Sequence, residues 1–286
     1  MRATKVVDIS AKCPTLLAMK WDPMPDLYAP YLRTRIRKGR GVGEGAQYAP
    51  WLRVRDVPSR GTSSSVTGIV VGRAFQLLSE LEATYFFLCE REQNTVDLRE
   101  QWPILEIDET LQLSKQLGVR HPYRRGYPDP FTIDFIITSD TVDGRQYRAA
   151  SIKSKDEAKN PAVRQRLAVE YLWCRAHGIP WTLVDTSHFN KILLGNLRFL
   201  RSWFRHRYEP DPALTIRFVE TFLKIYRRNV PLEALIVSME KSLRISESTA
   251  LDTFRYCSWR KEIPIALSRR VALNLPLTLR GTGVFA

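Results

Sequence analysis

Two spacings of apolar residues alternate along the middle of the chain. Residues 77–91 place apolar side chains every three or four positions, which predicts a helix, whereas Phe131–Thr138 is nearly continuously apolar and β-branched, which predicts a strand. A later segment opens with Asn-Pro and closes with Gly, as helices do. The predicted order is helix, strand, strand, strand, helix, strand, over residues 77–91, 96–98, 131–138, 145–155, 160–178 and 179–185.

The two ends of the chain follow other patterns. Prolines punctuate the first thirty residues. Towards the other end strands give way to amphipathic helices, of which the last two resemble a helix-turn-helix pair followed by a small β wing at 263–279. We predict an N-terminal extension, an α/β domain with a mixed sheet, and a mostly helical, winged-helix-like domain for binding DNA and partners, over residues 1–32, 33–189 and 190–286. A helical docking platform with a basic solvated face is the alternative for the last part.

The composition is that of a globular protein. Hydrophobic residues make up 44% of the 286 residues and charged residues 26%, which excludes wholesale disorder. No run approaches the roughly 20 apolar residues of a membrane span, and the first residues lack a secretory signal. The four cysteines lie far apart with no C-x-x-C motif, so neither a disulfide framework nor a zinc ribbon is expected. We therefore expect a cytoplasmic protein.

The charge balance is strongly basic. Lys and Arg number 44 against 30 for Asp and Glu, a formal net charge of +14. Such an excess favours a polyanionic partner, with nucleic acid first among them, although a basic solvated surface is the alternative. The candidate DNA contacts lie in a basic run before a glycine-rich stretch and near the predicted helix-turn-helix: Arg37, Lys38, Arg40, Arg255, Arg260 and Lys261.

A carboxylate in the middle of the predicted strand needs a reason, because Asp is disfavoured there. If Asp143-Gly144 forms the two-residue turn of a hairpin, Asp134 lies opposite Lys153, and Ser151 shares their face of the sheet. A cross-strand ion pair on a solvated face would have the same residues, so both interpretations stay open.

Two glutamates occupy apolar stripes of the flanking helices. Glu82 lies among leucine and aromatic positions, and Glu170 repeats this on the helix at 160–178. A carboxylate there is costly unless it has a partner or a metal. For Glu82 the S-x-x-E spacing from Ser79 also fits a capping box, which is the structural alternative to a metal ligand.

Carboxylates that converge with a lysine suit metal-assisted phosphodiester hydrolysis. Mg²⁺ prefers oxygen ligands and keeps several waters, so one or two carboxylates and a substrate phosphate complete its shell. The metal lowers the pKa of a bound water, and the lysine can orient or help deprotonate that water. No G-x-S-x-G motif supports acyl transfer.

Several motifs follow one another in an order that is typical of one nuclease family. They are G-R-G-V-G-E-G-A-Q-Y-A-P-W-L (39–52), V-P-S-R-G (57–61), L-L-S-E-L-E (77–82), V-D-L-R-E-Q-W-P-I-L (96–105), G-V-R-H-P (118–122), D-F (134–135) and I-P-W (179–181). Over roughly residues 33–200 the chain resembles the TnsA family, the endonuclease subunits of heteromeric cut-and-paste transposases, which have the restriction-endonuclease-like fold.

The resemblance implies a set of site residues. Glu82, Asp134 and Lys153 match the family's catalytic residues, and Glu170 corresponds less securely to a further helix glutamate. Where the family carries Gln this chain has Ser151, a shorter and weaker ligand. A bridging water or the Ile152 carbonyl can fill that ligand position, and Lys155 competes with Lys153 for the lysine role.

The resemblance also implies a reaction and partners. The reaction is Mg²⁺-dependent hydrolysis of the 5′ strands at transposon ends, with Mn²⁺ expected to substitute. The implied partners are transposon-end DNA, the DDE transposase subunit TnsB and the AAA+ regulator TnsC, with no membrane. Two alternatives remain: a stand-alone restriction or repair nuclease of the same fold, and a non-catalytic DNA-binding adaptor in which Asp134 and Lys153 form an ion pair.

Overall fold

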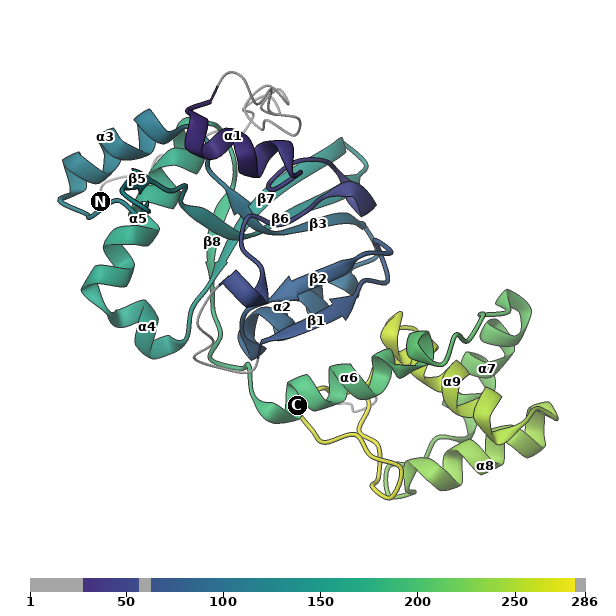
Figure 1. Ribbon diagram of the computed structural model, residues 1–286. Helices are drawn as coiled ribbons and strands as arrows, with labels where there is room; N and C mark the ends of the chain where they lie inside the picture. Colours follow the sequence, from purple (N-terminus) through teal and green to yellow (C-terminus); the bar gives the residue numbers. More distant parts are fainter. Residues whose placement is uncertain (1–27, 57–62, 281–286) are drawn as a thin grey trace. The chain divides into compact units, whose positions relative to one another are not determined.

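The computed structural model describes residues 28–56 and 63–280, and it divides into two compact units (Figure 1). Unit 1 holds the described residues up to Leu78 together with Asn94–Thr186, and unit 2 holds Ser79–Gln93 together with the described residues from Ser187. Residues 1–27 of the predicted extension and the V-P-S-R-G motif lie outside the described residues. None of the described helices is both long and apolar enough to cross a membrane.

The centre of unit 1 is a four-stranded mixed sheet in the order β3-β6-β7-β8. Its first three strands are antiparallel neighbours, and β8 runs parallel to β7. The mixed α/β architecture predicted from the sequence is therefore confirmed. The strands are β3 (Thr95–Pro103), β6 (Thr132–Thr141), β7 (Gly144–Ile152) and β8 (Trp181–Val184).

One helix packs directly on this sheet. Helix α5 (Pro161–Ala176) begins at the Asn160 cap, whose side chain accepts the Ala162 N–H, and it buries Val169 and Trp173 against strand residues such as Ile136. The central strand β6 carries Phe135, Ile136 and Ile137, all fully buried, because it has a neighbour on each side and is covered on both faces.

Several elements of unit 1 are not predicted by the apolar pattern. Leu32 and Ile36 of α1 are buried beside Trp51, so the basic run at residue 33 is a helix with one apolar side. The others lie outside the helices and strands predicted from the sequence, except that β2 ends where the predicted helix at 77–91 begins and α4 begins where the predicted strand at 145–155 ends. These elements are α1 (Pro30–Arg37), the hairpin β1 (Ser64–Thr67) and β2 (Ala74–Leu77), α3 (Ile107–Leu117), the hairpin β4 (Tyr123–Arg124) and β5 (Tyr127–Pro128), and the short α4 (Lys155–Lys159).

The hairpin register differs from the predicted one. Thr141 pairs with Gly144 and Phe135 with Ala150, so Val142 and Asp143 form the turn and Gly144 (φ +99°) begins β7. Continuing this register places Ser151, not Lys153, opposite Asp134. The prediction that Asp134 faces Lys153 directly is thus wrong by two residues. A shift of two keeps every side chain on its predicted face, because strand side chains alternate with a period of two.

Unit 2 is helical, as predicted for the C-terminal part. Helix α2 belongs to it because Glu90 and Arg201 form a buried ion pair of 2.9 Å, and because the Arg91 guanidinium donates to the carbonyls of Ser258 and Trp259. This helix therefore differs from the prediction, which includes it in the α/β domain of residues 33–189. The helices are α2 (Glu80–Glu90), α6 (Lys191–Arg205), α7 (Pro212–Ile225), α8 (Leu232–Leu243) and α9 (Glu247–Trp259).

The predicted β wing does not form as strands in the described part of unit 2. The segment after α9 makes two isolated bridges, Ile265 with Leu279 and Pro231 with Pro276. Prolines lack the N–H that a ladder needs, and residues 264 and 276 are both proline. The segment instead packs Leu267 and Val271 beside Asn196 of α6, whose side chain donates to the Leu267 carbonyl and accepts the Val271 N–H.

Candidate active site

Asp134 and Lys153 form the central contact of the candidate site in unit 1. Lys153 Nζ lies 2.7 Å from Asp134 Oδ2, and the same oxygen accepts the Ile152 N–H at 2.7 Å. The ammonium also donates to the Ile152 carbonyl at 2.9 Å. Asp134 is 8% exposed, and the Lys153 side chain is 27% exposed. This is a pair held at the edge of the core, unlike a solvated cross-strand pair.

The pair lies at the end of β7, where the strand no longer pairs with β6 but still pairs with β8. The described pairing of β7 with β6 ends at Ala150, while its pairing with β8 runs on to Ile152. The Ile152 N–H therefore points to the Asp134 carboxylate. The Thr186 hydroxyl then donates to the Lys153 carbonyl at 2.8 Å, which ties down the backbone of the lysine.

A second set of hydrogen bonds, centred on the buried Ser151 hydroxyl, lies on the same face of the sheet. The Ser151 hydroxyl donates to Glu170 Oε2 at 2.6 Å and accepts the Trp181 indole N–H at 3.2 Å. Burial raises the pKa of Glu170 to about 7, and the nearby Asp134 charge adds to the rise, while Lys153 and the Ser151 hydrogen bond oppose it. Glu170 is therefore a carboxyl group that can gain or lose a proton near neutral pH.

Ser151 holds Glu170 and has little capacity left for a metal. Its side chain is fully buried, its proton goes to Glu170, and one lone pair accepts from Trp181. These hydrogen bonds add to the reason given by the sequence, the short side chain, for which Ser151 is a weak candidate as a metal ligand. The Ile152 carbonyl, the other candidate for this ligand position, lies beside the Asp134 carboxylate through the shared Lys153 ammonium.

Glu82 lies in the first turn of α2, in unit 2, and is 7% exposed. Its backbone N–H donates to the Ser79 hydroxyl at 3.1 Å, and that hydroxyl lies 3.2 Å from Glu82 Oε1. Ser79 is thus the N-cap that the S-x-x-E spacing predicts. The glutamate carboxylate contacts the cap hydroxyl, and the role of Glu82 as a metal ligand stays a prediction.

The competitor lysine is placed elsewhere. Lys155 is exposed and begins α4, whose cap is Ser154 with a full capping box to Glu157. The chain leaves the strand at Ile152, so the face shared by alternate strand residues no longer reaches Lys155. Of the two lysines in this segment, Lys153 is the one that contacts Asp134.

The donor set fits a hard divalent cation. Asp134 Oδ2 takes the two hydrogen bonds described above, and Oδ1 has no hydrogen-bond partner among the described residues. Together with the Ile152 carbonyl it offers oxygen ligands, which Mg²⁺ prefers over nitrogen or sulfur. Within residues 28–56 and 63–280, no three His, Cys, Asp or Glu side chains gather into a metal-binding cluster. One or two carboxylates with water suit Mg²⁺ better than Zn²⁺.

The predicted DNA-contacting residues fall into two groups. Arg37, Lys38 and Arg260 are exposed, and Lys261 pairs with Glu92 at 2.8 Å. Two arginines are committed to partners within the chain: Arg40 to Asp56 at 2.9 Å and Arg255 to Asp252 at 2.8 Å. The role of all six in binding DNA stays a prediction.

Sequence reasoning missed Trp181 as a site residue. Its indole N–H donates to Ser151, and its ring contacts Tyr171 edge-on at 5.8 Å between centroids. The signal was present in the I-P-W motif, which puts a polar indole in an otherwise apolar strand.

Comparison with known proteins gives two matches. The family described as TnsA-like endonuclease N terminal matches residues 92–186, a span that includes Asp134, Lys153 and Glu170 but not Glu82. The transposon Tn7 transposition protein TnsA of Escherichia coli is 34% identical over 169 residues, or 59% of this chain. The match spans 61% of the length of that relative.

Proposed function

We propose that the chain is a TnsA-family protein, on the strength of the match over residues 92–186 and the 34% identity to the Tn7 protein, and that it is the endonuclease subunit of a heteromeric transposase. The observation that carries the proposal is the Asp134–Lys153 contact at 2.7 Å, within the matched span and beside a buried glutamate. The proposed reaction is hydrolysis of the 5′ strands at the ends of a transposon.

Lys153 orients the attacking water in this proposal. Its ammonium has three N–H donors, of which two reach Asp134 Oδ2 and the Ile152 carbonyl. These two acceptors fix the direction of the nitrogen at the partly exposed mouth of the site. Its positive charge offsets the negative charge that develops on the phosphorus oxygens, so it stabilises the transition state more than the bound substrate.

Asp134 and the Ile152 carbonyl are the proposed ligands of one Mg²⁺ in unit 1, and the family resemblance implies a role in metal binding for Glu82. When bound, Mg²⁺ supplies Lewis-acid activation of a water and stabilises charge on the leaving oxygen. Mn²⁺ accepts the same oxygen ligands and is expected to substitute. The Ile152 N–H holds Asp134 in place at 2.7 Å, so the carboxylate needs little reorganisation to bind a cation.

Glu170 contacts the site through its hydrogen bond with Ser151. With a pKa near 7 it can exchange a proton at neutral pH, and Ser151 and Trp181 fix its position. We assign it a positioning role, because its hydrogen bond of 2.6 Å goes to the fully buried Ser151 hydroxyl.

The proposed partners are the DDE transposase subunit TnsB, which cuts and joins the 3′ ends, and the AAA+ regulator TnsC. Unit 2 is proposed to bind them. The support is the face of α7, where Ile216 is 62% exposed and Leu223 is 43% exposed. These residues are seven positions apart and share one side of the helix, an arrangement typical of a protein contact.

A reconstituted transposition reaction tests the proposal. The chain is combined with its TnsB and TnsC partners and a transposon-bearing plasmid, and the cuts on each strand are mapped. Loss of 5′ cuts in a Lys153→Ala variant, with 3′ joining kept, is the expected result and converts simple insertions into cointegrates. Efficient site-specific cutting by the isolated chain would instead favour a stand-alone nuclease, and unchanged 5′ cuts in the variant would favour a DNA-binding adaptor.

A further inference from the structure

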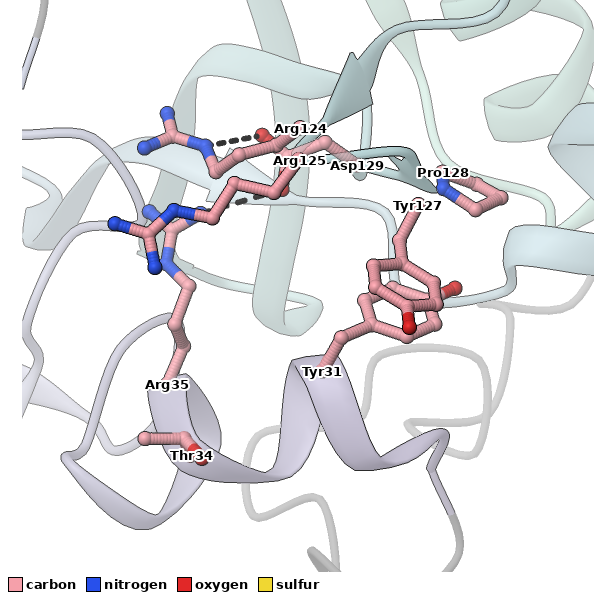
Figure 2. Close-up of a pocket in the computed structure, with 8 residues that line it drawn as sticks. All are labelled: Tyr31, Thr34, Arg35, Arg124, Arg125, Tyr127, Pro128 and Asp129. Carbon is pink, nitrogen blue, oxygen red and sulfur yellow. Dashed lines mark hydrogen bonds and ion pairs between the residues drawn. The ribbon is translucent and has the colours of Figure 1, made fainter.

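A basic groove lies between α1 and the β4–β5 hairpin in unit 1, apart from the candidate active site. It has a volume of about 470 Å³, and eight residues line it: Tyr31, Thr34, Arg35, Arg124, Arg125, Tyr127, Pro128 and Asp129. Figure 2 shows the arginines gathered around Asp129 and the two tyrosines stacked beside Pro128. Three guanidinium groups face one carboxylate, so the groove has an excess of positive charge.

The arginines of the groove differ in how they are held. Arg35 is fixed: it donates to Asp129 at 3.2 Å and to the Trp51 carbonyl, and it lies over the Trp51 ring. Burial lowers the pKa of Arg35 to about 10, and the positive charge of Arg124 adds to this effect. Arg124 donates from its Nε to Asp129 at 3.2 Å. Among the described residues no other hydrogen bond engages the ends of its guanidinium, so these ends can bind a ligand.

Arg125 is held at the tip of the hairpin in an unfavourable backbone conformation. Arg125 and Gly126 have φ values of +52° and +83°, as a type I′ turn requires, and glycine or asparagine normally fills both positions. Arg125 is exposed and forms no ion pair with any residue of the described part of the chain. An arginine that bears left-handed strain without an intrachain partner indicates an external anion.

The tyrosines close the other end of the groove. The rings of Tyr31 and Tyr127 stack at 4.8 Å between centroids with 14° between their planes, and Tyr127 is 55% exposed. A flat aromatic surface beside free guanidinium groups suits a ligand that alternates sugar with phosphate, since arginine binds phosphate through two parallel hydrogen bonds.

The groove is close to Asp134 along the chain. Asp129 lines the groove, and five residues of nearly extended backbone, at most about 18 Å, separate it from Asp134. Phe131 belongs to this connecting segment, and the guanidinium of Arg166 on α5 lies 5.8 Å from its ring. At about 3.4 Å per nucleotide, this separation corresponds to about five nucleotides of one DNA strand.

We infer that this groove binds the phosphodiester backbone of the DNA, within about five nucleotides of the cleaved bond, with Arg124 and Arg125 as the phosphate contacts. The inference rests on the proposed nuclease function. It adds a positioning contact outside the site that cuts. Phosphate contacts of this kind set the register of a protein on DNA without reading its sequence.

Salt-dependent DNA binding tests the inference. The full chain and an Arg124→Ala/Arg125→Gly variant are titrated against a fluorescent DNA duplex at several salt concentrations, without divalent metal, and anisotropy is measured. Each lost phosphate contact reduces the slope of log K against log salt by about 0.9. We expect the slope to fall by about 1.8 and the affinity to fall at least about tenfold at low salt. Glycine at position 125 suits the left-handed backbone, so the turn is kept.

A matched control removes the same charge elsewhere. Lys115 of α3 and Arg175 of α5 are exposed residues of unit 1 outside the groove, and the Lys115→Ala/Arg175→Ala variant is expected to keep the wild-type slope. If the groove variant unfolds, Arg125→Gly alone is measured, with an expected slope change of about 0.9.

The outcomes separate the two proposals. A groove variant that keeps the wild-type slope overturns the groove as a DNA site, while the proposed nuclease function stands on strand cleavage and its loss in Lys153→Ala. An equal loss of slope in the control overturns the groove too, because the effect would then be one of general charge. A wild-type chain that does not bind duplex DNA overturns the groove as a DNA site, while the nuclease function is judged separately by strand cleavage in the reconstituted reaction.

Discussion

Lys153 Nζ lies 2.7 Å from Asp134 Oδ2, although the register of β6 and β7, continued past the Phe135–Ala150 pair, places Ser151 opposite Asp134. The contact is diagonal across the strand pair, within reach of a long side chain. The Ser151 side chain does not take part in this contact, and its hydroxyl donates to Glu170 at 2.6 Å. One strand end therefore supplies a partly exposed cation and a fully buried hydroxyl to two different carboxyl groups.

Lys153 should be essential for strand cleavage. We expect Lys153→Ala to reduce 5′ cleavage at least about 100-fold, because the ammonium that orients water and offsets phosphate charge is lost. Single-turnover cleavage of an end-labelled transposon end, with the partner subunits present, measures the effect. Lys155→Ala is the matched control, since Lys155 is exposed on α4, and it should cut at the wild-type rate. An equal loss of 5′ cleavage in both variants would contradict a specific role of Lys153.

Glu82 should raise the affinity for the metal. In Glu82→Gln the side chain keeps its size and can still accept from the Ser79 hydroxyl, but it loses the charge that attracts a cation. The Mg²⁺ concentration for half-maximal cleavage should rise about 10–100-fold, in the range found for disturbed metal sites. Glu80→Gln, also in the first turn of α2, should leave the Mg²⁺ requirement unchanged. A Glu82→Gln variant with normal Mg²⁺ dependence would leave the glutamate as a helix-capping residue alone.

Ser151 should matter for stability and not for metal binding. Removing its hydroxyl leaves buried Glu170 and the Trp181 N–H without this partner, which should lower the free energy of unfolding by about 1–3 kcal/mol. Chemical denaturation of Ser151→Ala measures the loss. The Mg²⁺ dependence of cleavage should be unaltered; a several-fold rise in the Mg²⁺ requirement would identify the hydroxyl as a ligand after all.

Glu170 should make stability depend on pH in a defined window. Its pKa is raised from 4.5 to about 7 in the folded chain, so the folded state binds more protons than the unfolded state between these values. The stabilising contribution is complete below pH 4.5 and is lost as the pH rises through about 7. The free energy of unfolding should therefore be about 3 kcal/mol lower above pH 7 than at acid pH, as far as Glu170 contributes to it.

Glu170→Gln isolates this contribution. The amide oxygen can still accept the Ser151 hydroxyl proton, while the side chain no longer titrates. In metal-free denaturation curves at several pH values, the difference between wild type and variant should shift in favour of the variant between acid and neutral pH. A difference that is independent of pH would show that the pKa of Glu170 is the same in the folded and unfolded states.

The apolar pattern predicted the sheet face of the site correctly but not its register. Phe131–Thr138 predicted β6, and the turn signal predicted the hairpin to β7. The turn residues are Val142 and Asp143, so the predicted opposition of Asp134 to Lys153 is wrong by two positions. The side chains still lie on the predicted face, because a shift of two residues preserves their alternation. The lysine side chain is long enough to reach Asp134 diagonally.

Elements held by tertiary packing were predicted less well. Helix α1 is short and basic. Its two buried residues, Leu32 and Ile36, pack beside Trp51. Pro103 lies within β3, which is tolerated because β3 is an edge strand of the sheet. In both segments the packing partner, absent from any local window of sequence, stabilises the element.

The sequence by itself determined the order of the main elements, the face shared by Asp134, Ser151 and Lys153, and the unusual position of Glu170, because periodicity and burial cost are local properties of a chain. Only the tertiary structure decided which partner each polar group takes. It joined Ser151 to Glu170 and Trp181, and it collected the groove arginines of α1 and the β4–β5 hairpin around Asp129. Hydrogen bonds and ion pairs depend on distances of a few ångströms between segments far apart in sequence, and these distances are set by how the whole unit packs.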